Sequence, residues 1–276
     1  MQKMTDGNDS GTKIKICGLR RREDILAVNE AKPDYCGFII EFPSSFRSVT
    51  ADEVRELVKE LDPEIRPVGV FVNAPMELVR TLLDDGTLAL AQLHGQEDES
   101  YIRELKTYTD KLIIKAFSIK TAEDIEKALQ SPADYILLDQ GGGGTGKTFD
   151  WSLIPEIQRP FFLAGGIGAS NLGQAIREIH PYAVDLSSSV ETDGMKDRDK
   201  ILNGEIDSKS TFDKHLNKIL TSLSIDPDTL MGFSPRVQSV DAVYSQNAPI
   251  DYQMNDKAKI EYDLLQDILN LCSVYY

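Results

Sequence analysis

The residues best suited to catalysis or ligand binding lie in one run, from Tyr135 to Trp151. In this run an apolar segment ends in a carboxylate and is followed by glycines. Asp139 closes the apolar segment, and burial there would favour the protonated form that a general acid needs. The structural alternative for Asp139 is a helix cap or an ion-pair partner. The run also spells Gly141-x4-Gly146-Lys147-Thr148, the pattern of a nucleotide-binding P-loop.

The surroundings of the glycines argue against the P-loop. A P-loop lysine opens a long helix. Here Pro155 and Pro160 follow Lys147 closely and leave room for only one or two helical turns. No second apolar strand ends in a convincing magnesium-binding aspartate. We therefore interpret the glycines, with Gly143 and Gly144 among them, as a mobile loop.

Further candidate residues occur where other apolar segments end. Cys17 ends the first segment, and its thiolate would act as a base or nucleophile if nearby cations lower the thiol pKa; simple packing is the alternative. Arg47 would hold a carboxylate with two hydrogen bonds, or would be a solvated arginine. Gln92 and His94 would position a substrate, although a lone histidine at a strand end is more often structural.

Two later loops are suited to phosphate. Gly165 and Gly166 follow one apolar segment, and Asp185, Ser187 and Ser188 belong to the next. Glycines let a backbone approach a ligand closely, and backbone N–H groups in the last two loops of a barrel commonly bind phosphate. Ordinary tight turns are the alternative. The pattern favours a phosphorylated substrate.

The elements that must position these residues alternate between apolar strands and amphipathic helices. Strands are predicted at residues 13–17, 35–40, 67–72, 88–93, 112–117, 134–139, 161–164 and 183–187. Helices are predicted at residues 22–31, 50–61, 75–83, 121–129 and 170–179, and Thr50 with Glu53 forms a capping box. Eight strands interleaved with helices predict a (β/α)8 TIM barrel, an α/β fold whose active sites lie at the carboxyl ends of the strands. A doubly wound open sheet is the alternative, but no G-x-G-x-x-G follows the first strand.

Composition narrows the classes of partner. The chain has 276 residues, 41% of them hydrophobic, and a formal net charge of -15, which argues against a nucleic-acid partner. Its three cysteines, Cys17, Cys36 and Cys272, form neither a disulfide framework nor a zinc motif. No apolar run is long enough to span a membrane, and the polar start lacks a secretory pattern. We therefore expect a cytoplasmic protein without a membrane partner or a metal.

The predicted domains are a flexible leader at residues 1–12, a barrel at residues 13–223 and a C-terminal extension at residues 224–276. The eighth barrel helix is expected at Ser210–Leu223, after an insertion at residues 203–209. The extension is rich in Ser, Asp, Asn, Gln and Pro, which predicts partial disorder before a terminal helix at Ala258–Leu271. Its predicted role stays open between binding of a partner, a fusion remnant and an unstable appendage.

Seven motifs in order resemble one family. They are Lys15-Ile16-Cys17-Gly18-Leu19, Gly37-Phe38 with Ser45-Phe46-Arg47, Val68-Gly69-Val70-Phe71-Val72, Gln92-Leu93-His94-Gly95, Leu137-Leu138-Asp139 with residues 143–151, Ala164-Gly165-Gly166-Ile167, and Val184–Ser188 with Val190–Gly194. Over about residues 13–201 the chain resembles phosphoribosylanthranilate isomerase, the barrel enzyme of tryptophan biosynthesis. One such motif is weak, but seven in sequence are specific.

The resemblance implies an Amadori rearrangement of N-(5-phosphoribosyl)anthranilate to 1-(2-carboxyphenylamino)-1-deoxyribulose 5-phosphate, without metal or organic cofactor. It implies that Asp139 is the general acid at the furanose oxygen and that the Cys17 thiolate takes the C2 proton. Arg47 is implied to hold the anthranilate carboxylate. The remaining implied contacts are those of the phosphosugar: Gly165, Gly166, Ser187 and Ser188 with the phosphate, and Asp185 with a ribose hydroxyl.

Two residues depart from the family's pattern. Phe46 stands where the family usually has proline, and we expect it to shift Arg47 or to add a stacking face. Ser189 stands where the family usually has glycine, and its side chain is expected to crowd the phosphate. Two alternatives therefore stay open: a related phosphosugar isomerase, and a catalytically impaired barrel that acts as a binding protein.

Overall fold

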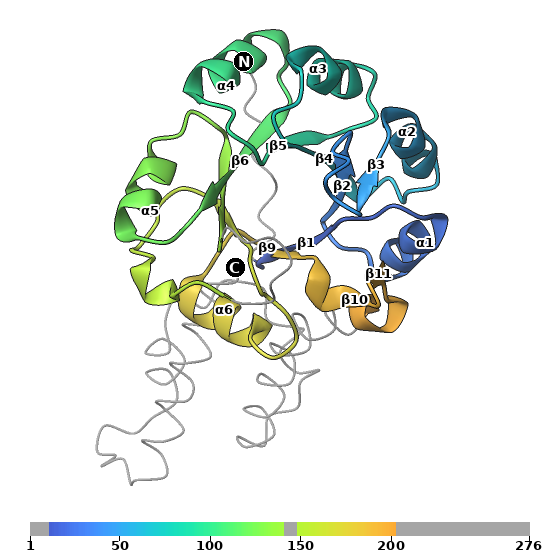
Figure 1. Ribbon diagram of the computed structural model, residues 1–276. Helices are drawn as coiled ribbons and strands as arrows, with labels where there is room; N and C mark the ends of the chain where they lie inside the picture. Colours follow the sequence, from blue (N-terminus) through green and yellow to red (C-terminus); the bar gives the residue numbers. More distant parts are fainter. Residues whose placement is uncertain (1–10, 141–147, 203–276) are drawn as a thin grey trace, which may run out of the picture. The chain divides into compact units, whose positions relative to one another are not determined.

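A computed structural model describes residues 11–140 and 148–202, and within them the predicted (β/α)8 barrel is confirmed (Figure 1). All strand pairs of the main sheet are parallel, and β1 pairs with both β2 and β9, which closes the sheet. The described residues from Thr12 onward belong to one compact unit. The expected leader (except for its last two residues), the eighth helix Ser210–Leu223 and the extension at residues 224–276 lie outside the described residues.

The barrel strands follow the predicted apolar runs closely. The first two, β1 and β2, have the predicted bounds; β2 is an almost wholly apolar run, whereas β1 alternates lysine with isoleucine before Cys17. The strands are β1 (Lys13–Cys17), β2 (Tyr35–Ile40), β4 (Arg66–Phe71), β5 (Leu90–Leu93), β6 (Leu112–Ser118), β7 (Tyr135–Asp139), β8 (Phe161–Leu163) and β9 (Ala183–Leu186), with the two-residue β3 (Ser48–Val49) beside β2.

Six helices surround the barrel in the described residues (Figure 1). They are α1 (Arg22–Ala31), α2 (Ala51–Lys59), α3 (Met76–Asp84), α4 (Glu99–Tyr108), α5 (Ala122–Leu129) and α6 (Leu172–Ile179). The predicted capping box is present: Thr50 accepts from the backbone of Glu53, and the Glu53 carboxylate accepts from the backbone of Thr50. No described helix is long and apolar enough to cross a membrane.

Two apolar layers hold the barrel. Side chains at alternate strand positions fill its interior, among them Tyr35, Leu137 and Phe162. The intervening positions, such as Ile16 and Leu138, pack outward against the helices. This two-sided burial explains why the strands are apolar runs rather than alternating patterns.

The connection from β7 to β8 departs from the regular βα pattern. In its described part, residues 148–160, the helical element is the short 3-10 helix η1 (Trp151–Leu153), capped by Asp150. The long helix that a P-loop requires is absent from these residues, which agrees with the interpretation that the P-loop spelling is incidental.

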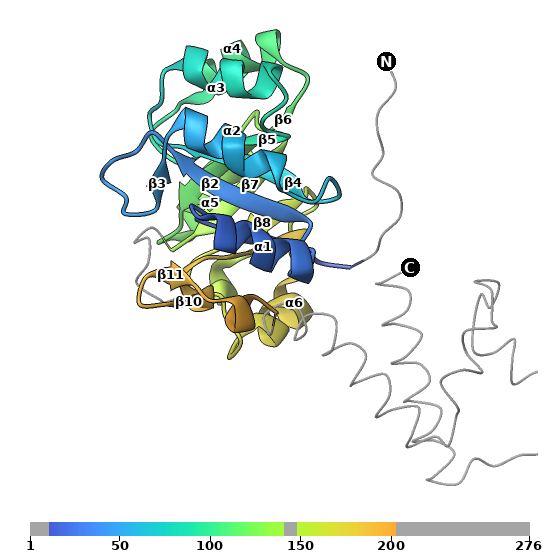
Figure 2. The same cartoon turned by 90° about the vertical axis from the view of Figure 1, so that its right-hand side faces the viewer.

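A small hairpin follows the barrel and was not predicted. After β9 the chain forms the 3-10 helix η2 (Ser188–Val190) and the antiparallel strands β10 (Glu191–Thr192) and β11 (Met195–Lys196). The turn residues Asp193 and Gly194 both have positive φ, as a tight hairpin turn requires. The hairpin lies beside α1 in both views (Figures 1 and 2).

The barrel interior generates a stability prediction. The Phe162 ring lies 5.4 Å from Tyr35 and 5.6 Å from Tyr135, centroid to centroid, with both pairs edge to face. Phe162→Ala should lower the free energy of unfolding by about 3–5 kcal/mol, because it removes a buried ring and leaves a cavity. Urea denaturation measures this. Leu26→Ala on the exposed side of α1 is the control, expected to change stability by less than about 0.5 kcal/mol; equal effects would contradict this account of the core.

Candidate active site

Cys17 ends β1 and is buried beside a lysine and an aspartate. Lys15 lies two residues earlier on the same strand, so both side chains point into the barrel. The Lys15 ammonium donates to both carboxylate oxygens of Asp185, at 3.0 and 2.9 Å. A Cβ placed on Gly37 would lie 2.8 Å from Cys17 Sγ and 3.1 Å from Lys15 Nζ. The glycine therefore leaves the space in which thiol and ammonium approach each other.

Opposing effects act on the pKa of Cys17. Burial raises the pKa of the thiol above its usual value, while Lys15 and, more weakly, Lys196 lower it. Burial would lower the pKa of Lys15, but Asp185 and Cys17 raise it above the usual value, so the ammonium stays charged at neutral pH. The cation that a reactive thiol needs is therefore present, although burial has the larger effect.

Asp139 ends β7 and stands at the end of a chain of polar side chains. Its Oδ2 lies 3.6 Å from Nε2 of His94, and Nδ1 of His94 lies 2.9 Å from the amide nitrogen of Gln92. With this amide donating, Nδ1 accepts and Nε2 carries the hydrogen that faces Asp139. Gln92 is buried, and its Oε1 has no hydrogen-bond partner among the described residues. Gln92 and His94 thus orient the predicted acid, and one amide oxygen is left for a ligand.

Gly165, the first residue of the glycine pair after β8, lies close to the predicted acid. Gly165 and Gly166 have φ of 83° and 70°. A Cβ on Gly165 would lie 2.7 Å from Asp139 Oδ1 and 2.7 Å from the backbone nitrogen of Gln140, so one of these groups would have to move. Asn171 fixes the loop by hydrogen bonds to Gly166 O and Gly168 N. The backbone at Gly165 therefore approaches Asp139 closely, whereas the expected approach of this pair to a phosphate stays a prediction.

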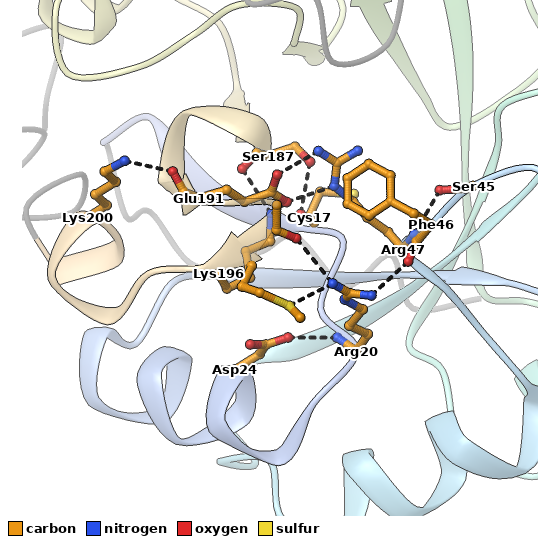
Figure 3. Close-up of polar contacts among 12 residues, drawn as sticks. Cys17, Arg20, Asp24, Ser45, Phe46, Arg47, Ser187, Glu191, Lys196 and Lys200 are labelled. Carbon is orange, nitrogen blue, oxygen red and sulfur yellow. Dashed lines mark hydrogen bonds and ion pairs between the residues drawn. The ribbon is translucent and has the colours of Figure 1, made fainter.

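Arg47 lies between β2 and β3 and is held by an acidic residue (Figure 3). Its Nε and Nη2 donate to the two carboxylate oxygens of Glu191 at 2.7 and 2.6 Å. Its guanidinium carbon lies 4.2 Å from the centroid of the Phe46 ring. Phe46 therefore supplies a stacking face, and the group stacked on it in this structure is Arg47 itself.

Glu191 and Lys196 were missed by the sequence analysis. Lys196 donates to Glu191 at 2.7 Å and to the carbonyl of Ser187 at 2.9 Å. Burial raises the pKa of Glu191, but Arg47 and Lys196 lower it more, so the carboxylate stays ionised. The only sequence signal was the Asp193-Gly194 pair, which favours a tight turn with the flanking charges side by side.

The turn after β9 ties this cluster to Cys17. The Ser187 hydroxyl donates to the carbonyl of Cys17 at 3.1 Å, and Ser188 begins η2. Ser189 is exposed, and a Cβ on Gly168 would lie 2.8 Å from its own Cβ. Ser189 thus occupies space that a glycine in the β8 loop leaves free.

The structure brings most predicted site residues together. Asp185 lies near both the Cys17–Lys15 pair and the Asp139–His94 pair. Burial raises the pKa of Asp185, Lys15 and His94 lower it, and Asp139 raises it, so all four groups lie within electrostatic range. Gly143 and Gly144 lie outside the described residues. No cluster of three or more His, Cys, Asp or Glu side chains that could hold a metal occurs in residues 11–140 and 148–202.

Comparisons with known proteins agree with this geometry. A family model described as N-(5'phosphoribosyl)anthranilate (PRA) isomerase matches residues 14–204. The N-(5'-phosphoribosyl)anthranilate isomerase of Endomicrobium trichonymphae is 45% identical over 194 residues, which cover 69% of this chain and 94% of that protein. The corresponding protein of Thermoanaerobacter sp. (strain X514) is 44% identical over 195 residues, with 68% and 94% covered.

Solved structures give the same result. The crystal structure of phosphoribosyl anthranilate isomerase from Thermotoga maritima is similar with a TM-score of 0.65 and 36% identity, covering 72% of this chain and 99% of that one. A phosphoribosyl anthranilate isomerase in complex with reduced 1-(o-carboxyphenylamino)-1-deoxyribulose 5-phosphate is similar with a TM-score of 0.63 and 34% identity, covering 72% and 99%. With its family match and its relatives at 44–45% identity, the chain belongs to the N-(5'-phosphoribosyl)anthranilate isomerase family.

Proposed function

We propose that this chain isomerises N-(5-phosphoribosyl)anthranilate to 1-(2-carboxyphenylamino)-1-deoxyribulose 5-phosphate in tryptophan biosynthesis. The observation that carries the proposal is the pairing of an oriented carboxyl group, Asp139, with a thiol beside a buried ammonium, Cys17 and Lys15. An aldose–ketose shift needs one group that protonates the ring oxygen and another that removes the C2 proton. The family to which the chain belongs indicates that the substrate is N-(5-phosphoribosyl)anthranilate.

The reaction begins at Asp139. Its carboxyl proton passes to the furanose oxygen as the bond between C1 and that oxygen breaks, and the anthranilate nitrogen donates its lone pair to form a Schiff base. The Cys17 thiolate then takes the C2 proton, and the electron pair of the broken C2–H bond forms the C1–C2 double bond of the enolamine. Tautomerisation of the enolamine gives the ketone. Lys15 stabilises the thiolate before it takes the C2 proton, since a charged thiolate in a buried site needs a nearby cation.

The other site residues bind the substrate in this proposal. Arg47 holds the anthranilate carboxylate, and Asp185 contacts a ribose hydroxyl. Gln92 and His94 orient Asp139, and the free Oε1 of Gln92 accepts from a substrate hydroxyl. The phosphate lies on backbone amides of the loops after β8 and β9, at Gly165, Gly166, Ser187 and Ser188, with Gly143 and Gly144 in the covering loop.

A related phosphosugar isomerase that uses two aspartates is disfavoured, because β1 ends in Cys17 rather than an aspartate. The impaired binding barrel predicts intact folding without turnover. Purified protein and one fluorescence assay separate these possibilities.

Turnover is followed as the loss of substrate fluorescence. The wild type should be active, while Cys17→Ala and Asp139→Asn should each lower kcat by about 10²–10⁴-fold, because each removes one proton-transfer group. Cys36→Ala is the matched control: Cys36 is also buried, on the neighbouring strand β2, but packs toward the helices. An inactive wild type would refute the proposed function, and a fully active Cys17→Ala would refute the role of the thiol.

The pH dependence follows from the raised pKa of Cys17. The base acts only when deprotonated, and burial favours the neutral thiol, so kcat/KM should increase with pH into the alkaline range. Cys17→Asp places a group of much lower pKa at the same position and should move this limb to acidic pH. The test is to measure kcat/KM from pH 5 to 10 for both proteins. If the rise of kcat/KM with pH occurs at the same pH in Cys17→Asp, a group other than residue 17 determines it.

Gly165 offers a test of how closely Asp139 is held. Gly165→Ala should lower kcat by about 10²-fold, because the added Cβ displaces the acid from its productive position. Gly86→Ala is the matched control: Gly86 has a similar positive φ of 79°, but nothing lies within 4 Å of its added Cβ. It should lose stability alone. Comparable kinetic losses in both variants would show that backbone strain, and not contact with Asp139, matters.

A further inference from the structure

Arg47 is held in one orientation by Glu191 of the β10–β11 hairpin, and Lys196 of the same hairpin holds Glu191 (Figure 3). Glu191 accepts from Nε and Nη2 of Arg47, and Lys196 donates to Glu191 from the other side. The side chains of Arg47, Glu191 and Lys196 are only 13%, 7% and 1% exposed. A buried cluster of this kind fixes geometry more than it stabilises the fold, since desolvation offsets most of the attraction.

The hydrogen bonds occupy one edge of the guanidinium. A carboxylate can bind an arginine with two hydrogen bonds either at the Nε–Nη2 edge or at the Nη1–Nη2 edge. Glu191 takes the first edge. Nη1 has no hydrogen bond to any residue in 11–140 or 148–202, and Phe46 covers one face of the plane. The second edge is therefore left for another carboxylate, and the orientation of the plane is already set.

The net charge of the cluster of Arg47, Glu191 and Lys196 also favours binding of a carboxylate. Arg47 and Lys196 bring two positive charges and Glu191 one negative charge, and no other described carboxylate is hydrogen-bonded to the three side chains. The cluster is thus one carboxylate short. Lys196 also donates to the Ser187 carbonyl, and Ser187 donates to the Cys17 carbonyl. The carboxylate clamp and the predicted base are therefore joined through one turn.

We propose that Glu191 is a positioning residue for Arg47: it holds the Nε–Nη2 edge, with Lys196 as its anchor, so that the free edge faces the carboxylate of the substrate. The inference rests on the proposed function, since it takes the anthranilate carboxylate as the ligand. It adds that recognition of this carboxylate depends on a residue that does not touch the substrate.

The test compares two stable ligands in wild type and Glu191→Gln. One is reduced 1-(o-carboxyphenylamino)-1-deoxyribulose 5-phosphate, and the other is its phenylamino counterpart without the carboxylate. Calorimetry should show that Kd rises at least about tenfold for the first ligand and less than about twofold for the second. Steady-state rates should show KM raised with kcat changed by less than about threefold, because an interaction outside proton transfer is lost.

Removing the negative charge of Glu191 would by itself strengthen binding of an anionic ligand. Weaker binding by Glu191→Gln would therefore show that Arg47 has lost its orientation. Tighter binding of the first ligand would show that Glu191 competes with the substrate, and equal changes for both ligands would show a structural role; either result overturns the proposal. Glu191→Asp keeps the charge but is too short to reach both cations, so it should give the same selective loss if Glu191→Gln does not fold.

Glu30→Gln is the matched control. It removes a glutamate–arginine pair that ties Arg198, two residues after Lys196, to α1 without contacting Arg47. Both ligands should bind this variant as they bind the wild type, and a selective loss here would also overturn the proposal. A wild type that binds neither ligand and shows no turnover would refute the proposed function, whereas an active wild type with unchanged Glu191→Gln would refute the inference alone.

Discussion

The buried ion pair between Lys15 and Asp185 is the interaction on which the site depends. Lys15 has no exposed surface, and both oxygens of Asp185 accept from its ammonium. An isolated charge at this depth would be strongly disfavoured, so each partner requires the other. The parallel register of β1 and β9 sets the two residues directly opposite each other. The strand register of the barrel therefore fixes the Lys15 ammonium close to Cys17.

That cation decides what Cys17 can do. Burial alone would keep the thiol neutral, and a neutral thiol removes no proton. Gly37 contributes by having no side chain where sulfur and nitrogen approach. Asp139 also has one polar neighbour and one glycine: His94 lies on one side and the backbone of Gly165 on the other. Each of the two groups proposed to react thus has a polar partner and a glycine beside it.

Much of this could be predicted from the sequence, for physical reasons. Buried parallel strands are apolar runs, and their carboxyl ends converge, so Cys17 and Asp139 stood out as polar residues at the ends of such runs. The β10–β11 hairpin escaped prediction because its two-residue strands carry no periodicity. The contact of Arg47 with Glu191 joins residues 144 positions apart, which no local pattern reveals. Phe46 and Ser189 were recognised as departures, but only the structure shows that Arg47 and Gly168 accommodate them.

The most direct test of this account is the ionisation of Cys17 itself, measured as its alkylation by iodoacetamide against pH, with Cys17 followed by peptide mass spectrometry. Lys15 favours the thiolate and Asp185 opposes it. The midpoint of alkylation should therefore move to higher pH in Lys15→Met and to lower pH in Asp185→Asn, relative to the wild type. Midpoints that stay together in all three proteins would contradict the claim that the buried pair sets the charge of Cys17.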